Sequence, residues 1–511
     1  MSPRPPGVRL RSLFLVLLVV TASLSGLTVQ SDEAAAQPLT DFPYRQEIPV
    51  PIDTGQPGAT YQPVDLRISF DHACWAKNET VHSVRVAAET NGELTELESQ
   101  IYDLAYTDGS HIDACSLVFY IPGWATGSER YLVLYDDEET FPPRYPDHVG
   151  VEEASYYYEP VPGQRIDFDY YKLMQEEDVA YGVIQQGELL GNGISQVVVK
   201  MKPGAPAYET NYADQMASFS LFYSVDGDQE RTGTGYAEEV SKAVLVDGTL
   251  MVRVQLAGAD PDGTVYSDHV YTYYYSPPAA TAMRNRMSVN IHQQVLESVD
   301  IGGNMEEDGM YAGILSFRVR SQSFDKLNTG RILPYVHMPD ENGIVRAYEM
   351  PLNPISSEHD WVLRTRDDAD IGPAGWVSLD DPGTGKAHGL VFQSTDGLYP
   401  GREDGLQVKA SGQQYVNVPG LEADAGQVIV NRNAYETGGE HNIRLPGDLD
   451  VQTNVAFFTS ETGGYDAIAQ EAALFRQLVA QRPYERGTIE SDTAAAYNLT
   501  VAAHLAPSFP L

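Results

Sequence analysis

Short runs of branched and aromatic residues, separated by tight-turn dipeptides, recur along most of the sequence and constrain its fold more than any other feature. Residues 64–70, 116–121 and 249–256 are such runs, and pairs such as Asn91-Gly92 stand between them. Branched and aromatic residues favour strands, while Asn-Gly and Asp-Gly pairs favour two-residue hairpin turns. Regular short strands at this spacing predict an all-β protein built from β-sandwiches rather than from alternating strands and helices.

One amphipathic stretch, over residues 465–481, departs from this pattern. Ile468, Ala472, Phe475 and Val479 recur at the spacing of one helical face, and Pro483 follows the stretch. This periodicity predicts a single C-terminal helix that packs on a sheet. We expect a polar linker and a terminal strand to follow it, over residues 484–511.

The length of the chain predicts more than one domain. Its 511 residues exceed the size that one hydrophobic core ordinarily serves. A Pro- and Gly-containing segment at residues 160–163 marks the expected boundary. We therefore expect an N-terminal β-sandwich over residues 37–160 and a larger β-sandwich over residues 165–483, with the helix at its end.

The first 36 residues have the order of a secretory signal peptide. Arg4, Arg9 and Arg11 precede an apolar segment at residues 13–27, and small residues at 34–36 fit a cleavage site before Gln37. The apolar segment is shorter than the roughly 20 residues that span a bilayer. We expect export to the cell surface or the medium, with no membrane span after cleavage. Retention of the segment as an anchor is the alternative.

If the chain is exported, its two cysteines and its two N-x-T sequons predict covalent modifications. Cys74 and Cys115 are the only cysteines, and in an oxidising compartment two such residues predict one disulfide. A metal site is the rival, although two cysteines supply too few ligands. Asn78 and Asn498 begin N-x-T sequons and are the expected glycosylation sites of a glycoprotein.

The charge balance is strongly acidic. The chain has 72 Asp and Glu against 33 Lys and Arg, a formal net charge of −39, and only 8 of the basic residues are lysines. Hydrophobic residues still make up 42% of the chain, so it is not a disordered acidic segment. An acidic surface with few lysines indicates a halophilic protein whose self-repulsion is screened by salt. The same charge argues against nucleic acids and anionic membranes as partners.

Familiar catalytic motifs are missing from the sequence. There is no H-E-x-x-H, C-x-x-C, G-x-S-x-G, phosphate loop or dinucleotide fingerprint. We therefore expect neither a resident metal nor a cofactor. Calcium is the alternative, because acidic turns at residues 226–228, 260–262 and 367–370 offer oxygen ligands. None of them has the spacing of an EF-hand loop.

The candidate site comes from two successive strand segments rich in Tyr, His and Arg. In the first, alternation places His269, Tyr271, Tyr273 and Tyr275 on one face; in the second, Arg284, Arg286, Asn290 and His292 are separated by even steps. We expect antiparallel pairing to bring both sets to one sheet face, where they would border an open concavity. Tyrosine rings with Arg, Asn and His suit saccharide binding. The alternative is a tyrosine-rich sheet whose cross-strand pairs serve stability alone.

The order of these segments resembles that of carbohydrate-active proteins with a galactose-mutarotase-like super-sandwich behind a smaller β-sandwich. The resemblance covers about residues 165–460 and rests on residues 247–254, the Tyr-rich strand, residues 284–292, and segments 376–380 and 384–392. The chain also looks like uncharacterised archaeal surface proteins. The super-sandwich resemblance implies binding or processing of carbohydrate, and several members of that fold are polysaccharide lyases. It is a pattern of strands without a motif, so it carries over no catalytic residue.

Two functions follow as hypotheses. The first is a secreted or surface protein that binds or cleaves carbohydrate or another cell-envelope polymer. As a lyase it would need a base, a tyrosine acid and a cation for the uronate carboxylate; the catalytic candidates are His269, His292 and Tyr273, and the substrate-binding candidates are Tyr271, Tyr275, Arg284, Arg286 and His388. The second is a non-catalytic scaffold of the cell envelope, which explains the missing motifs with fewer assumptions.

Overall fold

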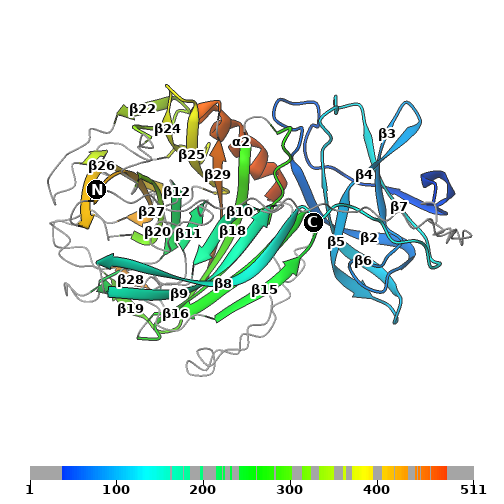
Figure 1. Ribbon diagram of the computed structural model, residues 1–511, viewed down its shortest axis with the longest axis horizontal. Helices are drawn as coiled ribbons and strands as arrows, with labels where there is room; N and C mark the ends of the chain where they lie inside the picture. The colour runs from blue at the N-terminus through cyan, green and yellow to red at the C-terminus, as the bar shows by residue number, and fades with distance from the viewer. Residues whose placement is uncertain are drawn as a thin grey trace, which may run out of the picture. The chain divides into compact units, whose positions relative to one another are not determined.

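The computed structural model describes part of the chain, drawn as coloured ribbon in Figure 1. The described residues are 37–161, 164–175, 178–184, 196–199, 215–220, 223–224, 231–232, 241–260, 262–280, 283–301, 313–323, 333–349, 361–363, 371–394, 406–418, 421–434, 443–445, 447–448, 450–460 and 462–479. The expected signal peptide, the linker and terminal strand at residues 484–511, and Asn498 lie outside them.

Strands make up most of the described chain, as the sequence predicts, and they begin with a small sandwich. After a 3₁₀ turn (η1, Leu39–Asp41) its strands are β1 (Tyr44–Glu47), β2 (Pro63–Trp75), β3 (Arg85–Thr90), β4 (Glu93–Leu97), β5 (Ser99–Tyr106), β6 (His111–Tyr120) and β7 (Arg130–Tyr135). They form two antiparallel sheets of orders β1-β7-β3-β4 and β2-β6-β5. Asn91 and Gly92 both have positive φ in the two-residue turn between β3 and β4, as predicted.

Two nine-stranded sheets follow. The first has the order β23-β26-β27-β20-β12-β11-β10-β9-β8. Its strands are β8 (Val149–Val161), β9 (Gln164–Gln175), β10 (Asp178–Ile184), β11 (Gln196–Val199), β12 (Gln215–Ser220), β20 (Gly313–Ser323), β23 (Trp361–Leu363), β26 (Leu406–Val418) and β27 (Leu421–Ala434). Because β8 pairs with β9 in this sheet, the chain leaves the small sandwich earlier than residue 160.

The second large sheet has the order β15-β16-β17-β18-β29-β25-β24-β21-β22 and is fully antiparallel. Its strands are β15 (Ser241–Asp247), β16 (Met251–Ala259), β17 (Val265–Tyr274), β18 (Met283–Val295), β21 (Tyr335–Pro339), β22 (Val345–Glu349), β24 (Trp376–Asp381), β25 (Lys386–Phe392) and β29 (Asp450–Ser460). Two short pairs complete the described strands: β13 (Tyr223–Ser224) with β14 (Arg231–Thr232), and β19 (Val299–Ile301) with β28 (Ile443–Leu445).

The two large sheets pack face to face around the main core. Leu173 of β9 and Val430 of β27 come from the first sheet, and Val254, Tyr273 and Phe457 come from the second. All five side chains are buried. We call the face of the second sheet that points into this core its inner face, and the opposite one its outer face.

The predicted helix is present as α2 (Gly464–Val479) and covers part of the outer face. Ile468, Ala472 and Phe475 pack against β24, β25 and β29, which confirms the expected apolar stripe. The helix lies beside β29 and β25 in Figure 1. It approaches the sheet closely at Gly389, where an added Cβ would lie 2.3 Å from Cγ2 of Ile468. No helix in the described part of the chain is long and apolar enough to cross a membrane.

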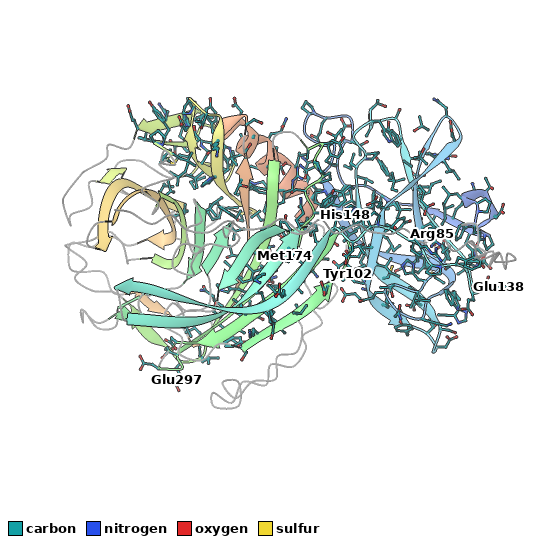
Figure 2. All side chains as sticks on the ribbon, viewed as in Figure 1. Arg85, Tyr102, Glu138, His148, Met174 and Glu297 are labelled. Carbon is teal, nitrogen blue, oxygen red and sulfur yellow. The ribbon has the colours of Figure 1, made fainter. Side chains whose placement is uncertain are left out.

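A side-chain amide joins the small sandwich to the second large sheet. Gln100 of β5 accepts hydrogen bonds from the backbone N–H groups of Leu250 and Met251, at 2.8 and 2.9 Å, and donates to the carbonyl oxygen of Met251. Figure 2 marks Tyr102 of the same strand, which also contacts the large sheet. Residues 37–511 form one compact unit, so the division into two domains stays a prediction.

The predicted disulfide is absent: Cys74 and Cys115 are separate, buried thiols. The cysteines lie on neighbouring strands, but an irregular register in β2 places Cys115 opposite Ile68 and Cys74 opposite Ile112. The thiol of Cys74 lies 3.6 Å from the hydroxyl of Ser83 instead. The sequence shows that both cysteines lie near strands of one sandwich, but it does not show this offset.

Candidate functional site

The Tyr-rich strand faces the core, so the site expected from it is not formed. In the register of β17 and β18, Tyr273 lies opposite Met287 and His269 lies opposite Ile291. These residues therefore share the inner face of the sheet. His269, Tyr271 and Tyr273 are fully buried, and Tyr275, just after the strand, is 7% exposed. The core therefore encloses three of the four side chains, and only a small part of Tyr275 is exposed.

Polar partners inside the core satisfy these side chains. The His269 ring lies 2.8 Å from the hydroxyl of Ser267 and 3.2 Å from that of Tyr271, and Tyr273 donates a hydrogen bond to Gln175 at 2.8 Å. Burial raises the pKa of Tyr271 and Tyr273 well above that of an exposed tyrosine. A general acid works best with a pKa near the working pH. His269 and Tyr273 are therefore enclosed in the core in this structure, and their expected catalytic roles stay predictions.

The even-numbered residues of β18 lie on the outer face, apart from the tyrosines. His292 lies opposite Asp268, its side chain is 15% exposed, and its Nε2 lies 2.6 Å from Asp450 Oδ1. Asn290 donates to the side-chain oxygen of Asn454. Arg284 belongs to the same strand, but its side chain is outside the described part. The expectation that one concavity unites His269, Tyr273, Arg284 and His292 is therefore wrong, since Tyr273 and His292 point to opposite faces.

His388 of β25 lies away from both groups. It lies opposite Leu379 of β24, and it shares the inner face with Leu390, two residues further along its strand. Its side chain is 2% exposed. Of the predicted substrate-binding residues, Arg286 lines the pocket described next.

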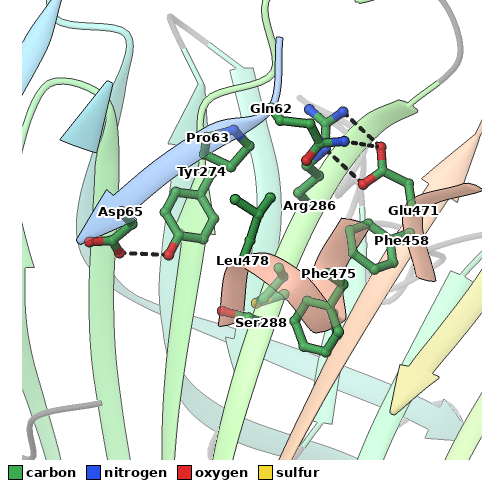
Figure 3. Close-up of a pocket in the computed structure, with 12 residues that line it drawn as sticks. Gln62, Pro63, Asp65, Tyr274, Arg286, Ser288, Phe458, Glu471, Phe475 and Leu478 are labelled. Atoms are coloured by element: carbon green, nitrogen blue, oxygen red, sulfur yellow. Dashed lines mark hydrogen bonds and ion pairs between the residues drawn. The ribbon is translucent and has the colours of Figure 1, made fainter. Parts of the chain in front are cut away.

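That pocket lies on the outer face, between β2, the strands β17, β18 and β29, and helix α2. It has a volume of about 50 Å³. Its lining residues are Gln62, Pro63, Asp65, Tyr274, Arg286, Met287, Ser288, Ala456, Phe458, Glu471, Phe475 and Leu478. Figure 3 shows Asp65 and Tyr274 on the left of the pocket, the group of Gln62, Arg286 and Glu471 at the upper right, and Phe458 and Phe475 below that group.

Arg286 and Glu471 form the first polar group of the wall. The guanidinium donates from Nη2 to Oε1 at 2.9 Å and from Nε to Oε2 at 3.4 Å. Gln62 donates to the same carboxylate at 2.8 Å, and Arg286 Nη1 reaches the carbonyl oxygen of Tyr61 at 3.2 Å. Two-point pairing of this kind fixes geometry as well as charge. The pair therefore ties β18, α2 and the small sandwich together at the pocket.

Asp65 forms the second polar group. Its carboxylate accepts hydrogen bonds from the hydroxyls of Tyr274 at 2.7 Å and Tyr102 at 2.8 Å. Nη2 of Arg253 lies 3.5 Å away, and that guanidinium also lies over the Tyr102 ring. Arg253 is 1% exposed and donates to Thr272. A buried charge needs such partners, and Tyr274 is the member of this network whose ring reaches the pocket.

Helical spacing explains how α2 contributes to the site. Glu471, Phe475 and Leu478 lie at i, i+4 and i+7 and so share one face of the helix. An acid inside an otherwise apolar stripe is the signal by which the sequence could have identified Glu471. The other members, Asp65 and Tyr274, come from segments about 200 residues apart, and nothing local in the sequence links them.

The described residues provide no metal centre. No three His, Cys, Asp or Glu side chains among them are placed to hold an ion together. Asp260, from one of the acidic turns, instead accepts hydrogen bonds from the N–H groups of Thr264 and Val265 in its own turn. The acidic turns at residues 226–228 and 367–370 lie outside the described residues, so calcium binding there stays a prediction.

Comparisons with known proteins give similarity of fold only. No protein-family model matches the sequence, and no curated protein matches it. The structure is similar to the galactosidase domain of the α-galactosidase–sucrose kinase AgaSK, with 12% identity and a TM-score of 0.28 over 64% of this chain and 41% of that one. It is also similar to the GH36 α-galactosidase AgaA from Geobacillus stearothermophilus, solved with raffinose, with 12% identity and a TM-score of 0.29 over 65% of this chain and 44% of that one.

A third similar structure is much shorter. The galactose mutarotase related enzyme from Lactobacillus acidophilus is 10% identical, with a TM-score of 0.30, over 56% of this chain and 96% of that one. The expected resemblance to carbohydrate-active proteins is thus found as a weak likeness of fold. This chain matches less than half the length of the two galactosidases. At these TM-scores the likeness says nothing about what the chain binds.

Proposed function

We propose that this protein binds a neutral saccharide outside the cytoplasm, and that the pocket beside α2 receives one sugar residue. The observation that carries the proposal is the two-sided wall of the pocket. The Tyr274, Asp65 and Ser288 side supplies hydrogen-bonding oxygens, while Phe458 and Phe475 supply ring surface. A sugar likewise has hydroxyl groups around its edge and C–H groups on its faces. Small-molecule sites usually combine apolar walls with a few placed polar groups in this way.

The size of the pocket limits what enters it. Its volume of about 50 Å³ is well below the roughly 300–1,000 Å³ of ordinary small-molecule sites. It exceeds the roughly 10–15 Å³ that one water molecule needs. We therefore expect it to take one end of a ligand, such as a terminal sugar residue, rather than the interior of a long chain.

The charges favour a neutral ligand and binding without cleavage. A lyase acting on uronates needs a cation for the substrate carboxylate, but Arg286 is already paired with Glu471. A glycosidase needs two carboxyl groups that act as acid and base or nucleophile. Glu471 is held by Arg286 and Gln62, and Asp65 is held by two tyrosines. These contacts support a site that recognises hydroxyl groups.

A binding experiment on the mature chain tests the proposal. We expect isothermal titration calorimetry with neutral mono- and hexasaccharides of glucose, galactose and mannose to detect binding in high-salt buffer. Replacing Tyr274 with Ala should weaken this binding at least about tenfold, since it removes both the ring and the hydroxyl at the wall. Tyr106→Ala, on an exposed strand end, is the control and should bind like the wild type. The proposal fails if no sugar of this set binds, or if Tyr274→Ala binds normally.

The rival function is a non-catalytic scaffold of the cell envelope. It is favoured by the same pairing of charges, because each contact described for Glu471 also fixes α2 to the sheet or to the small sandwich. A scaffold protein would bind to isolated cell envelopes, and it would show no binding to the glucose, galactose and mannose saccharides used in the titration. For either function we propose export with cleavage before Gln37, and N-terminal sequencing of protein recovered outside the cells tests that site.

A further inference from the structure

A turn of the small sandwich places a tryptophan in solvent. Trp124, between β6 and β7, is 45% exposed, whereas Trp75 and Trp376 are 5% and 3% exposed. Single exposed apolar residues are common and need no explanation alone. Trp124 differs from such isolated residues because of the structure of the turn that carries it.

The turn is held rigid from within. The carboxylate of Glu129 accepts hydrogen bonds from the N–H and hydroxyl of Thr126, at 2.8 and 2.7 Å, and from the N–H of Gly127 at 2.9 Å. The N–H of Ala125 donates to the carbonyl oxygen of Pro122 at 3.0 Å. An aromatic ring on a preordered turn loses little conformational entropy when a ligand covers it. A rigid turn with an exposed ring is therefore suited to binding.

Tyr61 connects this turn to the pocket. Its hydroxyl lies so close to Gly123 that a Cβ there would come within 1.9 Å of it, so a larger residue beside Trp124 would require Tyr61 to move. Tyr61 itself has a φ of 63°, a left-handed conformation that is strained for a non-glycine residue. Two hydrogen bonds hold it: its N–H donates to Ile121, and its carbonyl accepts from Arg286 of the pocket wall. Gln62, the next residue, lines the pocket.

Two acidic side chains on this turn and on the loop that faces it already accept hydrogen bonds. The Glu129 carboxylate is occupied by backbone and hydroxyl donors, and Asp53 accepts the N–H of Gly55. The hydroxyls of Thr126 and Ser128 on the same turn lie 2.9 Å apart. A turn that carries an aromatic ring and hydroxyls matches an uncharged, hydroxyl-rich ligand better than an anionic one.

We propose that the Trp124 turn is a second sugar subsite, which stacks on a further residue of the neutral oligosaccharide whose end enters the pocket. This inference rests on the proposed function and specifies its ligand: an oligosaccharide rather than a free monosaccharide. Tyr61 joins the two subsites, because it contacts the turn through its ring and the pocket through its carbonyl group.

Titration of two variants of the full mature chain tests the inference, with linear neutral hexasaccharides of glucose, galactose and mannose as probes against the matching monosaccharides. We expect Trp124→Ala to weaken hexasaccharide binding about three- to tenfold, the effect of one aromatic contact. It should leave monosaccharide binding unchanged. Trp124→Phe keeps a ring and should restore most of the affinity. Phe141→Ala, 55% exposed on the same sandwich, is the matched control and should change neither.

The outcomes separate this inference from the proposed function. If Tyr274→Ala abolishes binding while Trp124→Ala leaves the hexasaccharide affinity intact, the second subsite is refuted and the pocket stands. Equal weakening of both sugar lengths by Trp124→Ala would also refute it, because the residue would then act on the pocket itself. If the wild type binds none of these sugars, the proposed function fails, and this inference fails with it.

Discussion

Arg286 of β18 and Glu471 of α2 form an ion pair in which the two side chains are only 6% and 8% exposed. The guanidinium and carboxylate meet at two points, and Gln62 of the small sandwich donates to the same carboxylate. One acid on the helix therefore holds three segments that are far apart in sequence. The pocket exists where these segments meet, so its shape depends on this pair.

Removing one partner of the pair should destabilise the fold strongly. Glu471→Ala leaves the Arg286 charge buried without its carboxylate, which typically costs about 3–5 kcal/mol. Urea unfolding at constant high salt measures the change. Replacing both residues with Met should restore much of the loss, because no unpaired charge remains. Glu89→Ala breaks the more exposed pair with Arg130 and should cost less than about 1 kcal/mol. The prediction would be contradicted if Glu471→Ala lowered the free energy of unfolding by no more than Glu89→Ala does.

His82 should make the protein less stable as the pH falls. Burial lowers its pKa to about 3, and the nearby Arg85 charge acts in the same direction. Between its ordinary value near 6.5 and about 3, the unfolded chain therefore binds a proton that the folded chain does not. Stability is fully present above pH 6.5 and should fall by up to about 1.4 kcal/mol per pH unit below it.

The difference between wild type and His82→Gln isolates this contribution from the titration of carboxyl groups. We expect the variant to lose less stability between pH 6.5 and 4.5 in chemical unfolding. His111→Gln is an opposite control: hydrogen bonding to Asp108 raises the pKa of His111, so its contribution is present at low pH and is lost as the pH rises. If His82→Gln shows the same pH slope as the wild type, His82 is not buried in its neutral form.

The two cysteines should behave as inaccessible thiols. Both are buried, and burial raises the pKa of Cys74 to about 12, so little thiolate forms near neutral pH. We expect Ellman's reagent to react with neither in the native protein, and with both after unfolding in urea without a reductant. Protein recovered from outside the cells is the decisive sample. Failure to detect thiols in urea would contradict this prediction and show that Cys74 and Cys115 are joined by the disulfide expected from the sequence.

Local patterns predicted the elements, but not how they combine. The Asn91-Gly92 hairpin and the α2 stripe each depend on residues close in sequence, and both are confirmed. The alternation within β17 also places His269 and Tyr273 on one face, as expected. A shift of one residue in the register between β17 and β18 moves a whole set to the other face. The sequence does not show that register, so Tyr273 and His292 were wrongly placed together.

The pocket could not have been predicted for a related reason. Asp65 and Tyr274 meet across about 200 residues, and although Tyr274 belongs to the Tyr-rich strand, nothing local in the sequence shows that it pairs with Asp65. Glu471 is different, because an acid on the apolar face of a predicted helix must find a partner when buried. An acid in this position could have pointed to the site, although the prediction from the sequence did not use it.

The acidic surface should make stability depend on salt. At a net charge of −39 the chain repels itself in dilute buffer, and the Debye length falls from about 10 Å at 0.1 M salt to about 3 Å at 1 M. We expect the melting temperature to rise by several degrees between these NaCl concentrations at pH 7. Near the isoelectric point of about 4.4 the net charge vanishes, so the same salt step should have a much smaller effect there. Sucrose stabilises proteins by exclusion from their surface and does not screen charge. We therefore expect it to raise the melting temperature by a similar amount at pH 7 and near pH 4.4. A melting temperature that is flat or falls with NaCl at pH 7 would show that the acidic excess is not an adaptation to salt.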